Sequence, residues 1–183
     1  MVNIEDYQGT GEIQPYPHMF QNLGEAEYAI ALYMYLRLVG HEANTITILT
    51  PYQGQKNLIR SIAKRRCGSL GEPKKITTVD RYQGQSNDIV ILSMVRTTSA
   101  GYMNDSIRMA VAFSCARRGL FVLCRVSTFA TCKPFAEHSL MDIFSKDGRS
   151  TSALQLQIDN ETESVTNVFE LGKVVLKLAQ KNV

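Results

Sequence analysis

The stretch ITTVDRYQGQSNDIVILSMVRTT (residues 76–98), followed by NDSIRMAVAFSCARRGLFVL (residues 104–123), decides the fold of this chain. It contains two unbroken apolar runs, IVILSMV (residues 89–95) and GLFVLC (residues 119–124). Runs of this length are typical of strands in a parallel sheet that is covered on both faces. Between them, the segment Asp105–Arg117 has a helical period. The stretch therefore predicts a strand–helix–strand unit of an α/β protein.

Two places in this unit are candidates for chemistry. The polar loop YQGQ (residues 82–85) follows a short predicted strand, and the predicted helix ends near Arg117. In an open α/β sheet, ligands collect at the carboxyl ends of the strands. We therefore expect the loop and the end of the helix to lie at that edge of the sheet.

Composition permits many functions and excludes a few. The chain has 183 residues, 44% of them hydrophobic, which is enough for one substantial core with an appendage. Its formal net charge of +3 permits a nucleic-acid partner but does not argue for one. The four cysteines have no CxxC or Cys/His ligand spacing, which favours free thiols in a reducing compartment and argues against a zinc site. No signal peptide or membrane-spanning run is present in the sequence.

A second helix is predicted to begin at Asn22. Glu25 follows three residues later in the pattern of a capping box, and Gly40 is well placed to end the helix. The segment AIALYMYL (residues 29–36) is apolar on nearly all sides, so this helix should be deeply packed. Its tyrosines could pack in the core or stack on nucleic-acid bases, and core packing is favoured for Tyr28, Tyr33 and Tyr35.

A strand over Ile46–Thr50 and a helix over Tyr52–Arg66 come next. Lys56, Arg60 and Lys64 recur every four residues and so form one stripe on this helix. A stripe of this kind is usually a solvated face, and the alternative is contact with the phosphates of a nucleic acid. Both interpretations remain open at this stage.

The strand–helix alternation continues to Thr128 and predicts a doubly wound, mostly parallel sheet with helices on both faces. We divide the chain into a main domain, residues 1–130, and a C-terminal extension, residues 131–183. The extension should contain a polar linker, a short strand LQLQI (residues 154–158) and a terminal helix over Val165–Lys181. One side of that helix is predicted to be apolar, with Val165, Val168, Phe169, Gly172, Val175, Leu176 and Ala179.

Three segments resemble motifs of superfamily 1B helicases. TVDRYQGQSNDIVILSMVRT is similar to their motif V, roughly TVDxFQGxExDxVIxSxVR, and NDSIRMAVAFSCARRGL to their motif VI, roughly NDxRRLxVAxTRARxGL. ITILTPYQGQ resembles motif IV, often written TPYxxQ. The combination is specific because the two long motifs occur in the family's order and spacing. The resemblance implies that the main domain is a RecA-like second motor domain.

The resemblance narrows to the intron-binding helicases of the spliceosome. It is carried by VNIEDYQGTGE, FQNLGEAEYAIALYMYL, ITILTPYQGQKNLIR and KKITTVDRYQGQSNDI, and it is weaker beyond residue 130. It implies a single-stranded intron or pre-mRNA as partner, together with spliceosomal proteins, a nuclear location and no membrane. None of these implications follows from composition or spacing.

The resemblance also implies ATP and Mg²⁺, but only in a longer protein. These 183 residues contain no GxxxxGK[ST] phosphate loop and no strand ending in paired acidic residues. In these helicases both features belong to a first motor domain, which would precede this one in the full-length chain. Because phosphoryl transfer needs their charge neutralisation, we expect the chain alone to be inactive.

The family's functional residues map onto this sequence position by position. The resemblance places Gln83, Gly84 and Ser86 at the nucleotide, and Arg117 and Arg118 at the triphosphate. It places RNA contacts at Thr50, Tyr52, Gln55, Thr77 and Thr78, to which the stripe adds Lys56 and Arg60. No metal ligand is expected.

Two positions depart from the family's pattern. Ser86 stands where motif V has a glutamate that commonly contacts the ribose, and Cys115 stands where motif VI has the arginine that commonly faces the γ-phosphate. If the helix continues past Cys115, Arg118 shares its face and could partly compensate. Three functions remain open: an active motor domain, a spliceosomal scaffold that binds RNA and protein with impaired ATPase activity, and a related helicase outside splicing, such as the nonsense-mediated-decay type.

Overall fold

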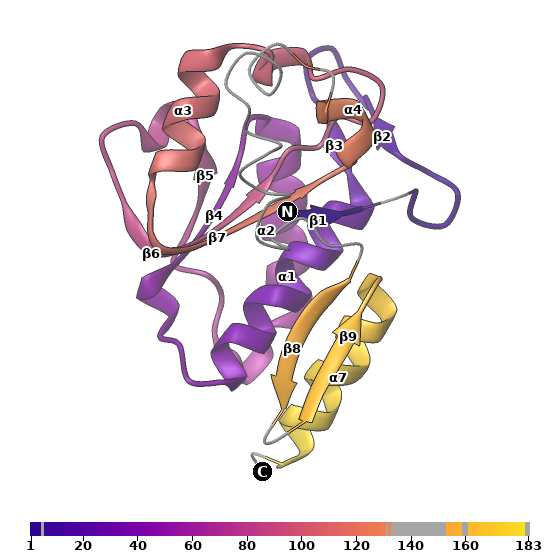
Figure 1. Cartoon of the computed structure of the whole chain (residues 1–183), viewed down its shortest axis with the longest axis vertical. Coiled ribbons are helices and arrows are strands. Elements are labelled where there is room, and N and C mark those ends of the chain that lie inside the picture. Colours follow the sequence, from indigo (N-terminus) through magenta and orange to yellow (C-terminus); the bar gives the residue numbers. More distant parts are fainter. Residues whose placement is uncertain (5, 131, 133–152, 159–160, 182–183) are drawn as a thin grey trace.

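A five-stranded sheet forms the centre of the computed structural model, which describes residues 1–4, 6–130, 132, 153–158 and 161–181 (Figure 1). The strands lie in the order β1-β7-β6-β4-β5, and every neighbouring pair is parallel. This confirms the predicted doubly wound α/β fold. The strands are β1 (Val2–Asn3), β4 (Ile46–Thr50), β5 (Lys75–Thr78), β6 (Asn87–Ser93) and β7 (Ala116–Cys124).

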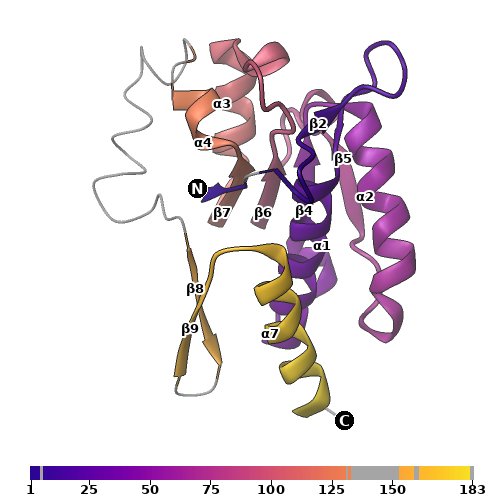
Figure 2. The ribbon, with the colours of Figure 1, turned by 90° about the vertical axis from the view of Figure 1, so that its right-hand side faces the viewer.

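Helices cover both faces of the sheet (Figure 2). Helices α1 (Leu23–Leu38) and α2 (Gln53–Arg66) lie on one face, and α3 (Ser106–Ser114) and α4 (Val126–Ala130) lie on the other. Consecutive residues of one strand point to opposite faces, so Ile48 packs with α1 and α2 while Leu49 packs with α3 and α4. The continuous apolar runs of the sequence are explained by this double covering.

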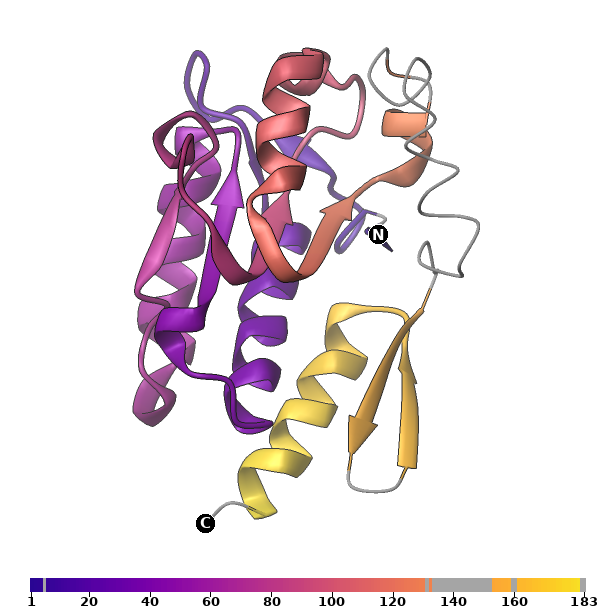
Figure 3. The same cartoon turned by 60° about the vertical axis from the view of Figure 1, so that its left-hand side comes forward.

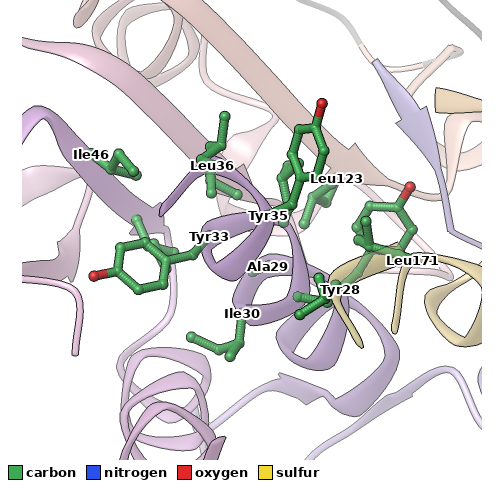
Figure 4. Packing of buried hydrophobic residues seen from close by; sticks show 14 of the residues in the cluster. Tyr28, Ala29, Ile30, Tyr33, Tyr35, Leu36, Ile46, Leu123 and Leu171 are labelled. Carbon is green, nitrogen blue, oxygen red and sulfur yellow. The ribbon is translucent and has the colours of Figure 1, made fainter. Parts of the chain in front are cut away.

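The tyrosines of α1 pack in the core, as predicted (Figure 4). Tyr28 and Tyr33 are fully buried, and Tyr35 is buried beside Leu36. The Tyr33 hydroxyl donates to the carbonyl of Gly71 at 3.0 Å. The Tyr35 hydroxyl donates to the carbonyl of Gln157 in the C-terminal extension at 3.1 Å. Because the three rings are buried, they are not available for base stacking.

Several short elements carry no clear sequence pattern. An antiparallel pair, β2 (Glu12–Ile13) and β3 (Gln21–Asn22), precedes α1. Strands of two residues are too short to show a period of two, so the sequence did not predict them. The 3₁₀ turns are η1 (Ala43–Thr45), η2 (Gly68–Leu70), η3 (Asp80–Tyr82) and η4 (Gly101–Met103).

The C-terminal extension packs against α1 (Figure 3). It consists of an antiparallel hairpin, β8 (Leu154–Ile158) and β9 (Glu161–Val165), and of α7 (Val168–Lys181). The predicted strand over 154–158 is confirmed, whereas β9 was not predicted and takes Val165 from the predicted helix. The predicted linker, except Cys132 at its start, lies outside the described residues.

The predicted apolar side of the terminal helix is only partly correct, because Val175 is buried as predicted but other members are exposed. Phe169 and Leu176 belong to it, yet they are 59% and 63% exposed. The buried side is offset around the helix and follows the spacing i, i+3, i+4, i+7. Its members are Leu171, Val174, Val175 and Leu178.

The boundary between α3 and β7 also differs from the prediction. Helix α3 ends at Ser114, and β7 begins at Ala116, which pairs with Asn87 of β6. Arg117 and Arg118 are therefore strand residues. The expected sharing of a helical face between Cys115 and Arg118 does not exist, because pairing with β6 draws these residues into the sheet.

Candidate nucleotide and nucleic-acid surfaces

The candidate residues divide between the two edges of the sheet. Gln85 Oε1 accepts from Lys75, the first residue of β5, and Gln85 Nε2 donates to the carbonyl of Arg81 at 3.3 Å. Ser86 directly precedes β6. The YQGQ loop therefore reaches the amino ends of the strands, not the carboxyl ends as expected. The physical reason is connectivity, because the segment between two parallel strands must return the chain to the starting edge of the sheet.

Arg117 and Arg118 lie at this amino edge and share one carboxylate. Arg117 Nε donates to Asp88 Oδ1 at 3.0 Å, and Arg118 Nη1 lies 3.9 Å from Asp88 Oδ2. The two arginine side chains are 59% and 75% exposed. One carboxylate against two guanidinium groups leaves positive charge at the surface, where an anion could approach.

The residues predicted for nucleotide contact are also exposed. Gln83, Gly84 and Ser86 all face solvent. Gly84 has a φ of +76°, a conformation that glycine adopts without steric cost, so the tight turn favours this residue. An open pocket of about 450 Å³ includes Asp88 and Arg118 at the same edge, but the loop residues do not line it.

Cys115 is not presented to solvent. It is 4% exposed, and its thiol donates to the carbonyl of Ala112 at 3.0 Å. Burial raises the pKa of the Cys115 thiol above its ordinary value. The position that carries the family's arginine thus belongs to the core beneath α3 in this chain.

The predicted hydroxyl groups lie at the carboxyl edge, where β4 and β5 end side by side. Thr50 pairs in register with Thr78, and Thr77 pairs with Leu49. Thr50 is fully buried and Thr78 is 8% exposed, whereas Thr77 is half-buried. The Thr50 hydroxyl accepts from the amide of Tyr52 at 3.4 Å, so it helps to shape the start of α2.

Tyr52 belongs to an aromatic and cationic cluster that the sequence analysis missed. Its ring meets that of Phe20 edge to face at 5.1 Å, and its hydroxyl accepts from the amide of Tyr102 at 3.1 Å. Arg96 lies 4.1 Å from the centre of the Phe20 ring, and Arg108 lies 3.7 Å from that of Tyr102. These contacts join segments far apart in the chain, so no local motif reveals them.

Gln55 is a core residue. It is fully buried, and its amide group donates to the carbonyl of Asn22 and to Ser93 Oγ, each at 3.0 Å. Its carbonyl accepts from the amide of Asn22 at 2.8 Å. Both donors of the side chain are used, so Gln55 is held inside the domain.

The basic stripe on α2 is uneven. Lys56 is 5% exposed, and burial, followed by the charges of Arg60 and Arg81, lowers the pKa of its ammonium group. Arg60 is exposed but donates to the carbonyl of Ile76 on the edge strand β5 at 3.0 Å. Lys64 is exposed. Over residues 53–86 there are eight Lys/Arg and two Asp/Glu, so this side of the domain is basic.

A hollow at the carboxyl edge lies beyond β6 and β7. It is an open pocket of about 930 Å³, rich in hydroxyl groups. Sequence reasoning did not single it out, because threonine and serine are ordinary loop residues. Its lining comprises Thr97, Thr98, Ser99, Ala100, Gly101, Asn104, Arg125, Ser127, Thr128 and Cys132.

In the described part of the chain, no group of three or more His, Cys, Asp or Glu side chains is arranged to hold a metal ion. Cys67, Cys115, Cys124 and Cys132 are all buried. No described helix is both long and apolar enough to span a bilayer.

Comparison with known families identifies the domain. A family model described as an AAA domain matches residues 1–127, which is more than half of the chain. The chain belongs to the superfamily 1 helicases, as a C-terminal motor domain. A motor domain of this kind fits the observed five-stranded parallel sheet.

Individual relatives agree with this assignment. RNA helicase aquarius of Mus musculus is 54% identical over 135 residues, 72% of this chain and 9% of the relative. Pre-mRNA-splicing factor cwf11 of Schizosaccharomyces pombe is 33% identical over 98% of this chain and 15% of its own length. A Schizosaccharomyces pombe helicase required for RNAi-mediated heterochromatin assembly is 34% identical over 87% of this chain and 16% of its own length. The motor domain thus spans less than a fifth of each of these three relatives.

Proposed function

We propose that this chain is the second motor domain of an ATP-dependent RNA helicase that acts in pre-mRNA splicing in the nucleus. The similarity to aquarius and to the splicing factor cwf11 supports splicing over other roles. In this proposal the partners are a first motor domain in the same full-length chain, single-stranded intron RNA and spliceosomal proteins. Residues 1–130 form the motor and residues 131–183 its extension.

The amino edge is the proposed nucleotide side. The observation that carries it is the pair of exposed arginines, Arg117 and Arg118, which share the single carboxylate of Asp88. These residues fit the charge of a triphosphate, and Ser86 and Gly84 are exposed on the loop that reaches the same edge. ATP and Mg²⁺ would supply the phosphoryl group and part of the charge neutralisation, while this chain contributes cations and exposed backbone.

The carboxyl edge is the proposed RNA side. Thr78 pairs with Thr50, whose hydroxyl accepts from the amide of Tyr52, and the hydroxyl-rich pocket lies along the same edge. Hydroxyl groups and arginines suit phosphate contacts, which position a strand without reading its sequence. Gln55 and Thr50 leave the list of direct contacts because both are fully buried, and they act from inside the domain.

Steady-state ATP hydrolysis by the full-length protein, with and without single-stranded RNA, tests this function. We expect RNA-stimulated hydrolysis that Arg117→Ala lowers by at least about tenfold, equivalent to about 1.4 kcal/mol of barrier. Lys173→Ala, an exposed change on α7, is the matched control and should have no effect. Stimulated hydrolysis that is indifferent to Arg117 would contradict the assignment of the amino edge.

A scaffold with impaired ATPase activity is the second candidate, and one observation favours it. Cys115 is buried where the family has its γ-phosphate arginine, so no cation is offered from that position. A full-length protein that holds intron RNA and splicing proteins but hydrolyses ATP at a rate unaffected by RNA would support the scaffold. Co-purification without splicing proteins would instead favour a helicase outside splicing.

A further inference from the structure

A buried polar cluster joins the start of α1 to the end of β6. Its members are Asn22, Glu25, Gln55, Ser93 and Val95, of which Glu25 and Ser93 are fully buried and Asn22 is 2% exposed. Ser93 Oγ donates to Glu25 Oε2 at 2.6 Å. Polar side chains are costly in a core unless they are hydrogen-bonded, so a cluster this dense needs an explanation beyond packing.

The backbone at Val95 is strained. Its φ is +76°, and the amide of Arg96 donates to the carbonyl of Met94 at 2.9 Å, which closes a γ-turn around Val95. A positive φ is a genuine outlier for a β-branched residue, and γ-turns of this hand are rare. Such a conformation persists only where the surroundings hold it in place.

Asn22 and Glu25 bind the backbone carbonyl and the backbone amide of Val95. The amide of Val95 donates to Glu25 Oε2 at 2.8 Å, and Asn22 Nδ2 donates to the carbonyl of Val95 at 3.2 Å. Asn22 also caps α1, because its Oδ1 accepts from the amide of Glu25 at 3.1 Å. In a reciprocal capping box, the Glu25 carboxyl would accept a hydrogen bond from the backbone amide of Asn22. Gln55 accepts from that amide instead, which leaves the Glu25 carboxyl for Val95.

The γ-turn lies just after β6 and sets the direction of the loop that follows at the carboxyl edge. Directly after it, the amide of Thr97 donates to Glu12 Oε2 at 2.6 Å, and Arg96 Nε donates to the same oxygen at 2.8 Å. Thr97 to Gly101 then line the hydroxyl-rich pocket. The direction of this loop therefore depends on a turn whose conformation is fixed from α1.

We infer that Asn22 and Glu25 are positioning residues that hold the γ-turn at Val95 and so present the loop of residues 96–101 to RNA. The inference rests on the proposed function, because it gives that loop a place on the RNA side of the motor. It also assigns a role to the buried Gln55, which ties the start of α2 to the same cluster through Asn22 and Ser93. Motif IV and the loop after β6 are thereby held in one arrangement.

The chain offers a matched set of variants. Glu25→Gln keeps an acceptor for Val95 and Ser93, whereas Glu25→Ala removes it. Asn22→Asp keeps the helix cap but loses the donor to the Val95 carbonyl, which separates the clamp from capping. Val95→Gly, combined with either damaging change, lets the backbone adopt a positive φ without the clamp.

Two measurements on the intact 183-residue chain test the inference. Hydrogen exchange of residues 94–98, compared with that of α2, reports the loop separately from global stability. Fluorescence anisotropy with a labelled single-stranded oligouridine reports RNA binding. We expect each of the variants Glu25→Ala and Asn22→Asp to accelerate hydrogen exchange of the loop by about tenfold. Each should also weaken RNA binding by about tenfold, in line with the loss of one or two hydrogen bonds. Glu25→Gln should stay close to the parent.

The added Val95→Gly change decides between positioning and simple stabilisation. Recovery of RNA binding in Asn22→Asp/Val95→Gly supports positioning, because glycine restores the turn while adding no contact. The inference is overturned if Asn22→Asp leaves hydrogen exchange of the loop unchanged. It is also overturned if Val95→Gly does not recover the RNA affinity that Asn22→Asp loses. If the parent chain binds no RNA while loop exchange responds as expected, the proposed RNA side is wrong, and the clamp shapes the loop for another purpose.

Discussion

At the scale of single residues, Glu25 links the buried cluster to pH. Burial raises its pKa from an ordinary 4.5 to about 8, against the opposing effect of its bonds from Ser93 and Val95, and the nearby Glu12 adds to the rise. Cys124 also faces it, and burial followed by the Glu25 charge raises the pKa of that thiol. Near neutral pH, Glu25 is therefore a neutral acid that still accepts both hydrogen bonds.

This shift predicts a stability that falls as pH rises. Between pH 4.5 and 8 the folded state binds the Glu25 proton and the unfolded state does not, so the free energy of unfolding decreases across that window. The slope from this one group is at most about 1.4 kcal/mol per pH unit. Urea unfolding of the parent and of Glu25→Gln at about pH 5.5 and about pH 7, each about one unit inside the window, checks it. Equal pH dependence in the two proteins would show that Glu25 ionises normally.

Cys115 gives the second prediction at this scale. Because its side chain is buried under α3, Cys115→Arg should destabilise the domain by about 1–3 kcal/mol through burial of an unpaired charge and overpacking. Cys115→Ala is the control for loss of the thiol alone. Thermal unfolding of both variants measures the difference. A stable Cys115→Arg protein would mean that the new side chain reaches the surface, and its ATPase activity in the full-length protein would then be worth measuring.

At the scale of elements, two leucines of the terminal helix α7 test which side of this helix packs against α1. Leu171 is fully buried, and Leu176 is 63% exposed on the same helix. Leu171→Ala should lower the free energy of unfolding by about 2–5 kcal/mol, whereas Leu176→Ala should change it by less than about 0.5 kcal/mol. Urea unfolding of both variants gives the comparison. Equal effects would indicate that α7 does not dock on α1 through this side.

Helix α2 provides the second prediction at this scale, since only part of its basic stripe is free to meet RNA. Lys64 is exposed, whereas Lys56 is buried and Arg60 is bonded to the edge strand. We expect Lys64→Glu to weaken oligouridine binding a few-fold at low salt and to make its salt dependence shallower, because about one phosphate contact is lost. Lys173→Glu, an exposed charge on α7, is the control. No change relative to this control would make Lys64 part of a solvated face.

At the scale of the whole molecule, the parts that sequence predicted are those with strong local patterns. The apolar runs around Val90 and Val122 gave two central strands, and Ile46–Thr50 was predicted to the residue. The burial of Gln55 was not predicted, because its partners, Asn22 and Ser93, lie 33 and 38 residues away. Arg117 was assigned to a helix because the helical period of α3 runs on through residues that pairing with β6 places in a strand. Both outcomes depend on contacts between segments far apart in the chain, which local patterns do not show.

The last prediction concerns the domain as one half of a nucleotide site. The chain offers Arg117 and Arg118 at an exposed edge, but its sequence contains no phosphate loop and no paired acidic residues after a strand to hold Mg²⁺. Two surface guanidinium groups near one carboxylate hold a triphosphate only weakly in water, since exposed ion pairs contribute at most about 1 kcal/mol each. We therefore expect isothermal titration of the 183-residue chain with ATP and Mg²⁺ to show no binding in the low-micromolar range, and no hydrolysis. The full-length protein is the positive control. Tight binding by the chain alone, abolished by Arg117→Ala, would instead mean that this domain carries a complete nucleotide site of its own.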